Sequence, residues 1–200
     1  MNRIMRILAI AAICQLSSSA MASTWTIDPD HSNVQFKIRH LMIANVKGVF
    51  GKVKGAVRID EKDMSKSAVD VTIEIDSINT GVAKRDAHLK SVEFFDAAKY
   101  PTMSFVSRKV TQSGKGKLKV LGVLSIHGIS RDVVLDVEGP TKEMKDPWGG
   151  IRRGASATAK INRMDFGITW NKTLETGGVM IGDAVFISLE IEMIKDQDTK

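Results

Sequence analysis

The sequence predicts an all-β protein whose antiparallel sheet closes into a barrel of about eight to ten strands. Apolar and polar residues alternate with a period of two through most of the chain, so each strand has one apolar and one polar face. A parallel sheet with helices on both sides needs strands that are apolar on both faces. A sheet with one apolar face must close on itself or pack against a second sheet, and strands of about ten residues with internal glycines favour closure.

The first 22 residues are expected to be a signal peptide and not part of the fold. A short basic region precedes an apolar stretch of about ten residues, Ile7 to Leu16, and Ala20-Met21-Ala22 fits a cleavage site of small residues. We expect cleavage after Ala22, which leaves residues 23–200 as a single exported domain. The leader holds the only cysteine, Cys14, so the exported domain is expected to fold without a disulfide bond.

Eight segments of the mature chain are predicted as strands. Val34, Phe36 and Ile38 alternate with polar residues in the first segment, and the alternation is equally clear from Val185 to Met193 in the last. Turn signals rich in glycine and proline separate most of the segments and suit antiparallel neighbours. In chain order the predicted strands are 33–39, 46–60, 69–76, 101–112, 116–127, 131–139, 151–163 and 185–193.

Glycines inside these strands are expected to form bulges or bends that let the sheet curl. They are Gly48, Gly51, Gly55 and Gly122. The apolar set changes phase between Phe50 and Val53, as a bulge near Gly51 would produce.

A short helical insert is predicted from about Val82 to Tyr100, within a sequence that otherwise reads as β-strand. It carries two adjacent phenylalanines, Phe94 and Phe95, in a chain of low aromatic content. Pro101 then returns the backbone to extended geometry. We interpret the insert as a cover over an apolar interior.

The charge of the chain gives only weak information about function. The formal net charge is +6 and most basic residues are scattered, apart from Lys109, Lys115, Lys117 and Lys119 around a predicted turn. We interpret this group as the solvated face of a hairpin, and attraction to anionic lipid headgroups or a diphosphate stays open as an alternative. Nucleic acid is not an expected partner, because no aromatic residues are interleaved for stacking on bases.

The residues offer little support for catalysis or metal binding. His31, His40, His88 and His127 have none of the tight spacings of metal ligands, so no metal site and no catalytic residue are predicted. Asp28 lies close to His31 and could orient the imidazole for proton transfer. The same cluster can equally satisfy the backbone of a turn.

Several short motifs follow one another through the mature chain. They are Trp25-Thr26-Ile27-Asp28 with His31-Ser32, Asp86-x-His88-Leu89, Phe94-Phe95-Asp96, Tyr100-Pro101, Arg163-x-Asp165-Phe166-Gly167 and Gly182-Asp183-x-Val185. In this order they resemble the YceI-like family of exported polyisoprenoid-binding proteins, and the resemblance covers nearly the whole mature chain. It implies a lipocalin-like antiparallel barrel, a periplasmic location, and an apolar interior that holds a polyisoprenoid such as a quinone tail or a polyprenyl lipid.

We therefore expect an exported lipid-binding protein that carries, stores or senses a polyisoprenoid lipid or quinone, with no cofactor beyond that ligand. A small barrel either fills its interior with side chains or leaves room for one ligand. The predicted apolar lining is Phe36, Ile38, Val71, Ile73, Phe94, Phe95, Phe105, Leu124, Ile126, Leu135, Val185, Ile187 and Leu189. The predicted polar residues at the mouth are His31, His40, Arg85 and His88.

Two other functions stay open at this point. One is a periplasmic enzyme that acts on a small lipid or isoprenoid, with His31 and Asp28 as a proton-transfer pair. The other is a stress-related interaction barrel with a packed interior and no ligand. The sequence also leaves open a transient contact with a membrane surface and a homodimer.

Overall fold

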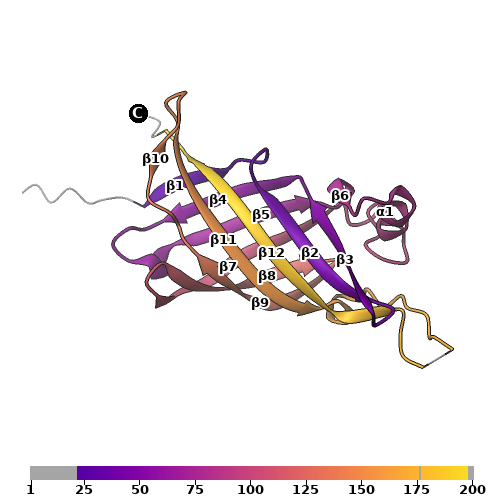
Figure 1. Cartoon of the computed structure of the whole chain (residues 1–200). Coiled ribbons are helices and arrows are strands. Elements are labelled where there is room, and N and C mark those ends of the chain that lie inside the picture. The colour runs from indigo at the N-terminus through magenta and orange to yellow at the C-terminus, as the bar shows by residue number, and fades with distance from the viewer. Residues whose placement is uncertain (1–21, 176, 198–200) are drawn as a thin grey trace, which may run out of the picture.

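The computed structural model describes residues 22–175 and 177–197, and it is an antiparallel β-barrel (Figure 1). The strands are β1 (Ser23–Ile27), β2 (Asn33–His40), β3 (Ala44–Phe50), β4 (Val53–Ile59), β5 (Ala68–Glu74), β6 (Ile78–Asn79), β7 (Thr102–Gly114), β8 (Lys117–Ile126), β9 (Ile129–Glu138), β10 (Met144–Lys145), β11 (Ile151–Asn162) and β12 (Ile181–Lys195). The helices are α1 (Ala83–Lys90) and the short 3-10 helices η1 (Met64–Lys66), η2 (Ile75–Ser77) and η3 (Arg163–Phe166). The predicted signal peptide lies outside the described residues, except for Ala22.

The sheet closes because β11 pairs with β9 on one side and with β12 on the other. The order β11-β9-β8-β7-β5-β4-β1-β12 is a ring of eight antiparallel strands. This confirms the predicted closed antiparallel barrel, with a strand number at the lower limit of the predicted range. Among the described residues, no helix has the length and hydrophobicity to cross a bilayer.

Three strands of the ring are interrupted and continue under a second label. β12 pairs with β2 along its first part and with β1 near its end, so β1 and β2 lie in line. β3 continues β4 in the same way across Gly51 and Lys52, and β6 continues β5 beyond η2. The change of phase predicted near Gly51 is therefore the break between β3 and β4.

The structure adds three short strands to the prediction, β1 and the two-residue strands β6 and β10, and it shortens the helix of the insert. β1 was not among the predicted strands, because its five residues are too few for the alternation to stand out. The insert is present, but its helix ends at Lys90, where the Ser91 N–H donates to the His88 carbonyl (3.1 Å). Turns complete the insert up to Pro101.

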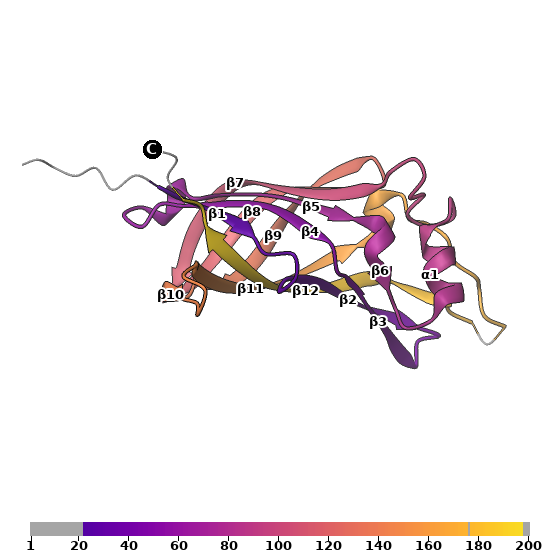
Figure 2. The ribbon, with the colours of Figure 1, turned by 90° about the horizontal axis from the view of Figure 1, so that it is seen from above.

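The end of the barrel opposite α1 is closed by a small packed cluster. Trp25 is fully buried there against Ile59 and Met193. The cationic groups of Arg153 and Lys195 lie 5.0 and 5.6 Å from the centroid of the Trp25 ring. Figures 1 and 2 both place α1 at the other end of the barrel. The two ends therefore differ, since one is closed by core residues and the other is covered by the insert.

Arg152 joins three carboxylates on the outer side of the barrel. Its Nη1 lies 2.5 Å from Asp28 and 2.6 Å from Glu192, and its Nε lies 2.7 Å from Asp146. Burial alone would raise the pKa of Asp28, but hydrogen bonds from Arg152 and His31 outweigh it and lower this pKa to about 2. The network fastens the loop between β1 and β2 to β11 and β12.

Acid should destabilise the fold through Asp28. Because its pKa is lowered, the carboxylate stabilises the folded state above about pH 4 and loses this effect as the pH falls to about 2. The contribution at neutral pH is about 2 kcal/mol. In urea unfolding followed across this range, Asp28→Asn should remove that part of the slope of the unfolding free energy against pH. Asp30→Asn, two residues away, keeps the Arg152 contacts and is the matched control. An unchanged slope in Asp28→Asn would contradict the assignment.

Candidate functional site

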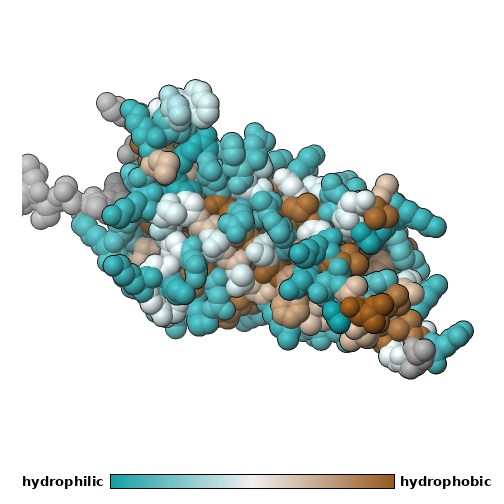
Figure 3. Space-filling model, in the orientation of Figure 1, coloured by the Kyte–Doolittle hydropathy of each residue, from teal (hydrophilic) through white to brown (hydrophobic). Residues whose placement is uncertain are grey.

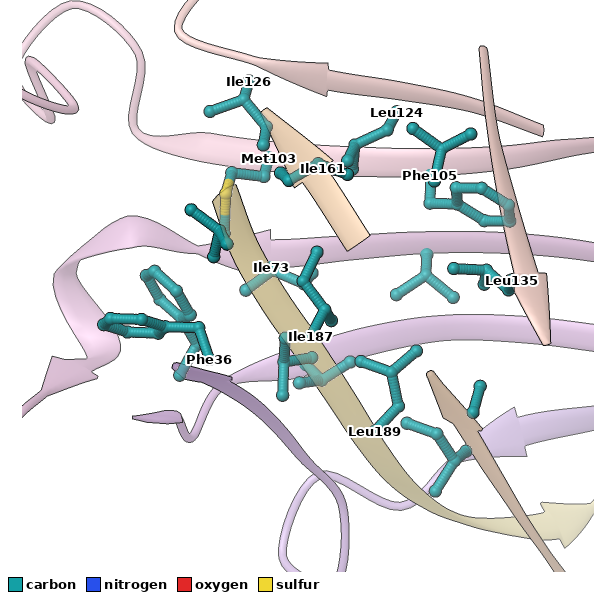
Figure 4. A pocket seen from close by; sticks show the side chains of 18 of the residues that line it. Phe36, Ile73, Met103, Phe105, Leu124, Ile126, Leu135, Ile161, Ile187 and Leu189 are labelled. Carbon is teal, nitrogen blue, oxygen red and sulfur yellow. The ribbon is translucent and has the colours of Figure 1, made fainter. Parts of the chain in front are cut away.

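A cavity of about 400 Å³ occupies the interior of the barrel. Its wall is formed by side chains from every strand of the ring, and Figure 4 shows them pointing into the space between the strands. The volume lies within the range of about 300–1,000 Å³ that is usual for ligand pockets. The alternation of apolar and polar residues along the strands makes this wall mostly apolar.

The cavity is long and narrow. On β12 its wall runs from Ile181 to Met193, which is roughly 40 Å of strand at about 3.3 Å per residue. With the usual tilt of barrel strands this corresponds to roughly 30 Å along the barrel axis. Ile59, Met64 and Met193 line the end next to the Trp25 cluster, so this cluster is the floor. A slender linear molecule matches such a space.

The structure places every predicted apolar residue on the cavity wall. These residues are Phe36, Ile38, Val71, Ile73, Phe94, Phe95, Phe105, Leu124, Ile126, Leu135, Val185, Ile187 and Leu189. The prediction missed other wall residues, among them Leu118, Val120 and Trp170. Leu118 and Val120 have the same phase in β8 as Leu124 and Ile126, so the alternation could have found them. Trp170 lies in an irregular segment, where apolar and polar residues do not alternate in a regular pattern.

Two glycines let phenylalanine rings lie close against the wall. A Cβ at Gly48 would lie 2.4 Å from Cζ of Phe36, and a Cβ at Gly122 would lie 2.4 Å from Cζ of Phe105. Each ring thus covers the glycine backbone of a neighbouring strand. At Gly122 the register shifts between Ser107 and Lys109, as the predicted bulge requires. At Gly48 the pairing continues without a shift, and the glycine there makes room for the ring.

The insert covers the other end of the cavity, as the sequence predicts. Phe94 and Phe95 line the cavity, and their ring centroids lie 5.2 Å from Trp170 and 5.7 Å from Phe50, respectively. The His88 ring packs edge-on between Phe94 and Trp170, at 4.8 and 5.0 Å. Aromatic contacts therefore hold the insert over the opening.

Hydrogen bonds fix the shape of the insert from within. The Asp86 carboxylate accepts from the backbone N–H and the hydroxyl of Thr80, at 2.9 and 2.5 Å. Arg85 Nε donates to the same hydroxyl (2.7 Å). At the base, the Ile75 N–H donates to the Pro101 carbonyl (2.9 Å), so the insert leaves and rejoins the barrel at one place.

The charged and titratable residues on the cavity wall all belong to the α1 end. They are Arg39, His40, Arg85, His88 and Arg163. Within residues 22–175 and 177–197, no aspartate or glutamate lines the cavity. The rest of the wall is apolar except for a few serines, so the cavity has one cationic end and one closed apolar end.

Arg163 is the most deeply buried of these cations. Its guanidinium donates to the carbonyls of Ile168 and Trp170, at 2.6 and 2.9 Å, and to that of Gly182 at 3.0 Å. Burial lowers the pKa of Arg163, and the nearby Asp183 carboxylate opposes this effect. Its carbonyl partners place Arg163 as the residue that holds the loop carrying Trp170 beside the cavity.

His31 does not line the cavity, which corrects its predicted place at the mouth. Its side chain is 60% exposed, and Nδ1 lies 2.9 Å from Oδ2 of Asp28. The hydrogen bond to Asp28 raises the pKa of His31. The predicted pair therefore forms, but on the outside of the barrel, where Arg152 also binds Asp28. Asp28, His31 and Glu192 bring three ligand-type atoms within 4.8 Å of one another, and the Arg152 guanidinium balances their carboxylates.

The predicted lysine group lies on the β7–β8 hairpin, away from α1. Lys117 pairs with Glu138 (3.0 Å) and Lys119 with Asp136 (2.6 Å), both on β9. These exposed pairs agree with the interpretation of a solvated hairpin face.

Comparison with known proteins identifies similar sequences and folds. The sequence profile of the YceI-like domain matches residues 25–193. A UPF0312 protein of Staphylococcus aureus (strain MSSA476) is 41% identical over 165 residues, which cover 82% of this chain and 92% of that protein.

Two solved structures share the fold. The crystal structure of the Campylobacter jejuni YCEI protein has 36% sequence identity and a TM-score of 0.67, and the match covers 80% of this chain and 91% of that one. A polyisoprenoid binding domain from Saccharophagus degradans, implicated in plant cell wall breakdown, has a TM-score of 0.63 at 15% identity. That match covers 86% of this chain and 98% of the other, and at this identity it shows the fold alone.

The volume of the cavity should depend on Gly48. In Gly48→Ala the new methyl group displaces the Phe36 ring into the lumen, so uptake of an apolar fluorescent probe should fall about tenfold, because overpacking costs about 1–3 kcal/mol. Gly51→Ala is the matched control, since a Cβ there meets no atom within 4 Å. Probe titration measures the effect, and equal affinities in the two variants would show that Phe36 does not limit the cavity.

Proposed function

The chain belongs to the YceI-like family, and we propose that it is a lipid-binding protein whose barrel holds one polyisoprenoid chain. The ligand is the tail of an isoprenoid quinone or a polyprenyl lipid. The observation that carries this proposal is the long apolar cavity, which is closed at one end by the Trp25 cluster and covered at the other by the insert. The name of the Saccharophagus degradans domain, which shares the fold, adds support.

The physical basis of affinity is the burial of hydrocarbon. Each buried methylene contributes about 0.8 kcal/mol, so about ten of them supply roughly 8 kcal/mol before the cost of ordering a flexible tail. Between the cationic α1 end and the floor, the described wall is apolar apart from Ser67 and Ser156, so few groups select one position along such a chain. Affinity therefore follows the length of the tail more than the chemistry of the headgroup.

The ends of the cavity give the ligand a direction. The floor at Ile59 and Met193 receives the tail, because these lining side chains are apolar and the cationic wall residues lie at the other end. The polar head lies at the α1 end, beside the predicted mouth residues His40, Arg85 and His88. This headgroup assignment is part of the proposal, and it excludes His31.

We place this role in the periplasm, in line with the predicted leader, and assign it no cofactor. The protein carries, stores or senses the lipid. Of the two other functions, the enzyme loses support because the pair of His31 and Asp28 lies outside the cavity that would hold its substrate. The interaction barrel with a packed interior is hard to reconcile with a cavity of about 400 Å³.

The purified protein should carry an extractable prenyl lipid when it is produced in a host with membranes. Ile187→Trp places a large ring inside the cavity and should lower the recovered lipid about tenfold, because overpacking costs about 1–3 kcal/mol. Ser188→Trp, at the next position on β12, points outward and should leave the lipid in place. Organic extraction followed by mass spectrometry measures both, and repeatedly empty extracts from the wild type would count against the proposal.

The variant His31→Ala distinguishes a lipid carrier from an enzyme that acts on the lipid. Because its side chain lies outside the cavity, His31→Ala should retain the bound lipid at the level of the wild type. Extraction and mass spectrometry of the variant test this. A chemically altered lipid in the wild type, replaced by an unprocessed one in His31→Ala, would favour the enzyme instead.

A further inference from the structure

The outer surface at the α1 end carries an exposed apolar tip. The turn between β2 and β3 presents Met42 and Ile43, which are 51% and 77% exposed. Figure 3 shows hydrophobic surface gathered at this end, where β2, β3 and the start of β12 meet. The Leu41 N–H donates to the Met180 carbonyl (2.7 Å), which fixes the neighbouring loop and its exposed Val179 beside the turn.

The backbone of this turn is strained. Leu41 and Met42 have φ values of 49° and 61°, in the left-handed region that bulky residues rarely adopt. The Arg39 guanidinium donates to the Met42 carbonyl (2.8 Å) and fixes the turn. Strained backbone that displays large apolar side chains to solvent is typical of a functional surface.

The β2–β3 hairpin, which ends in this tip, contains basic residues but no acidic ones. Residues 33–50 contain Lys37, Arg39 and Lys47 but no aspartate or glutamate. Lys37 and Lys47 face each other directly in the β2–β3 register, and like charges in this position destabilise a sheet. Lys37 lies over the Phe186 ring, and neither lysine forms an ion pair within the part of the chain that the structure describes.

The β8–β9 hairpin of the same barrel is a contrasting case, because its lysines are paired with carboxylates of the hairpin itself. There, Lys117 and Lys119 stand directly opposite Glu138 and Asp136 in the register and pair with them. The β2–β3 hairpin has no carboxylate of its own, so the charges of Lys37 and Lys47 are not neutralised within it and can attract an anion from outside the chain.

We propose that the β2–β3 tip docks the barrel on an anionic lipid bilayer. Met42 and Ile43 enter the boundary between headgroups and acyl chains, and the hairpin cations lie against lipid phosphates. Arg39 and His40, at the base of the same turn, also line the cavity, so docking brings the cavity mouth to the bilayer surface. The identity of the lipid that is exchanged at the bilayer rests on the proposed function. The docking of the tip on the bilayer does not depend on it.

Vesicle flotation tests the docking. The probe is the protein expressed from the full coding sequence and purified from the soluble fraction, with vesicles of phosphatidylethanolamine and phosphatidylglycerol. The wild type should float with these vesicles, less so at high salt and less so with phosphatidylcholine alone. Met42→Ser with Ile43→Ser should weaken binding at least about tenfold, because it removes the inserted apolar surface. Trp148→Ser is the matched control, since Trp148 is 86% exposed at the opposite end and should not contribute.

A fluorescent label locates the contact. In a Cys14→Ser background, Ile43→Cys or Trp148→Cys carries an environment-sensitive dye. Emission should shift to the blue on vesicles only for the label at position 43. An equal shift at both positions, no binding by the wild type, or full binding by the double variant would overturn the proposal. A concentration-dependent dimer that the double variant loses, without vesicle binding, would assign the tip to a second copy and overturn it as well.

Lipid extraction in the same samples separates this proposal from the proposed function. The double variant should keep its bound lipid, because Met42 and Ile43 do not line the cavity. If the wild type carries lipid but does not bind vesicles, the docking proposal is wrong and the carrier role is still supported. A wild type that floats with vesicles but yields empty extracts supports the docking and argues against the carrier role.

Discussion

The ladder between β11 and β12 is the interaction on which the rest of the structure depends. Its paired residues run without a shift from Arg152 with Ile194 to Asn162 with Ala184, and they close the sheet into a ring. Because apolar and polar residues alternate along most of the strands, closure turns their apolar faces inward together. If one strand shifted by one residue against its neighbour, its apolar side chains would point outward and its polar side chains inward. Burial of the apolar side chains therefore fixes the register of the strands.

The interior of the barrel contains a cavity because its inward side chains do not fill it. A ring of eight strands has just enough space for its own side chains or for one ligand. The rings of Phe36 and Phe105 lie over glycine backbone, which keeps them close to the wall. The Trp25 cluster closes one end with core packing, whereas aromatic contacts of the insert cover the other. The cavity therefore has two ends of different chemistry, and this difference underlies its proposed orientation for a lipid.

Local sequence pattern was enough to predict the long strands and much of the apolar wall, because the face on which a residue lies is set by its own strand. The pattern does not show which distant residues meet. His31 was assigned to the mouth, but its neighbour Asp28 binds Arg152, which is 124 residues away in the chain. That contact, and with it the outward position of His31, depends on the closed register. Trp170 was missed for a related reason, since buried carbonyl contacts of Arg163 place its loop and no repeat in the sequence marks it.

The ring is not equally strong around its circumference. Among the described residues, β9 and β11 pair only where Ser156, Ala157 and Thr158 meet residues 136–138, although both strands extend further toward α1. Few backbone hydrogen bonds must therefore break for this flank to part, and regions with few such bonds open at the lowest free energy. The seam between β9 and β11 is therefore the part of the ring that opens at the lowest cost in free energy.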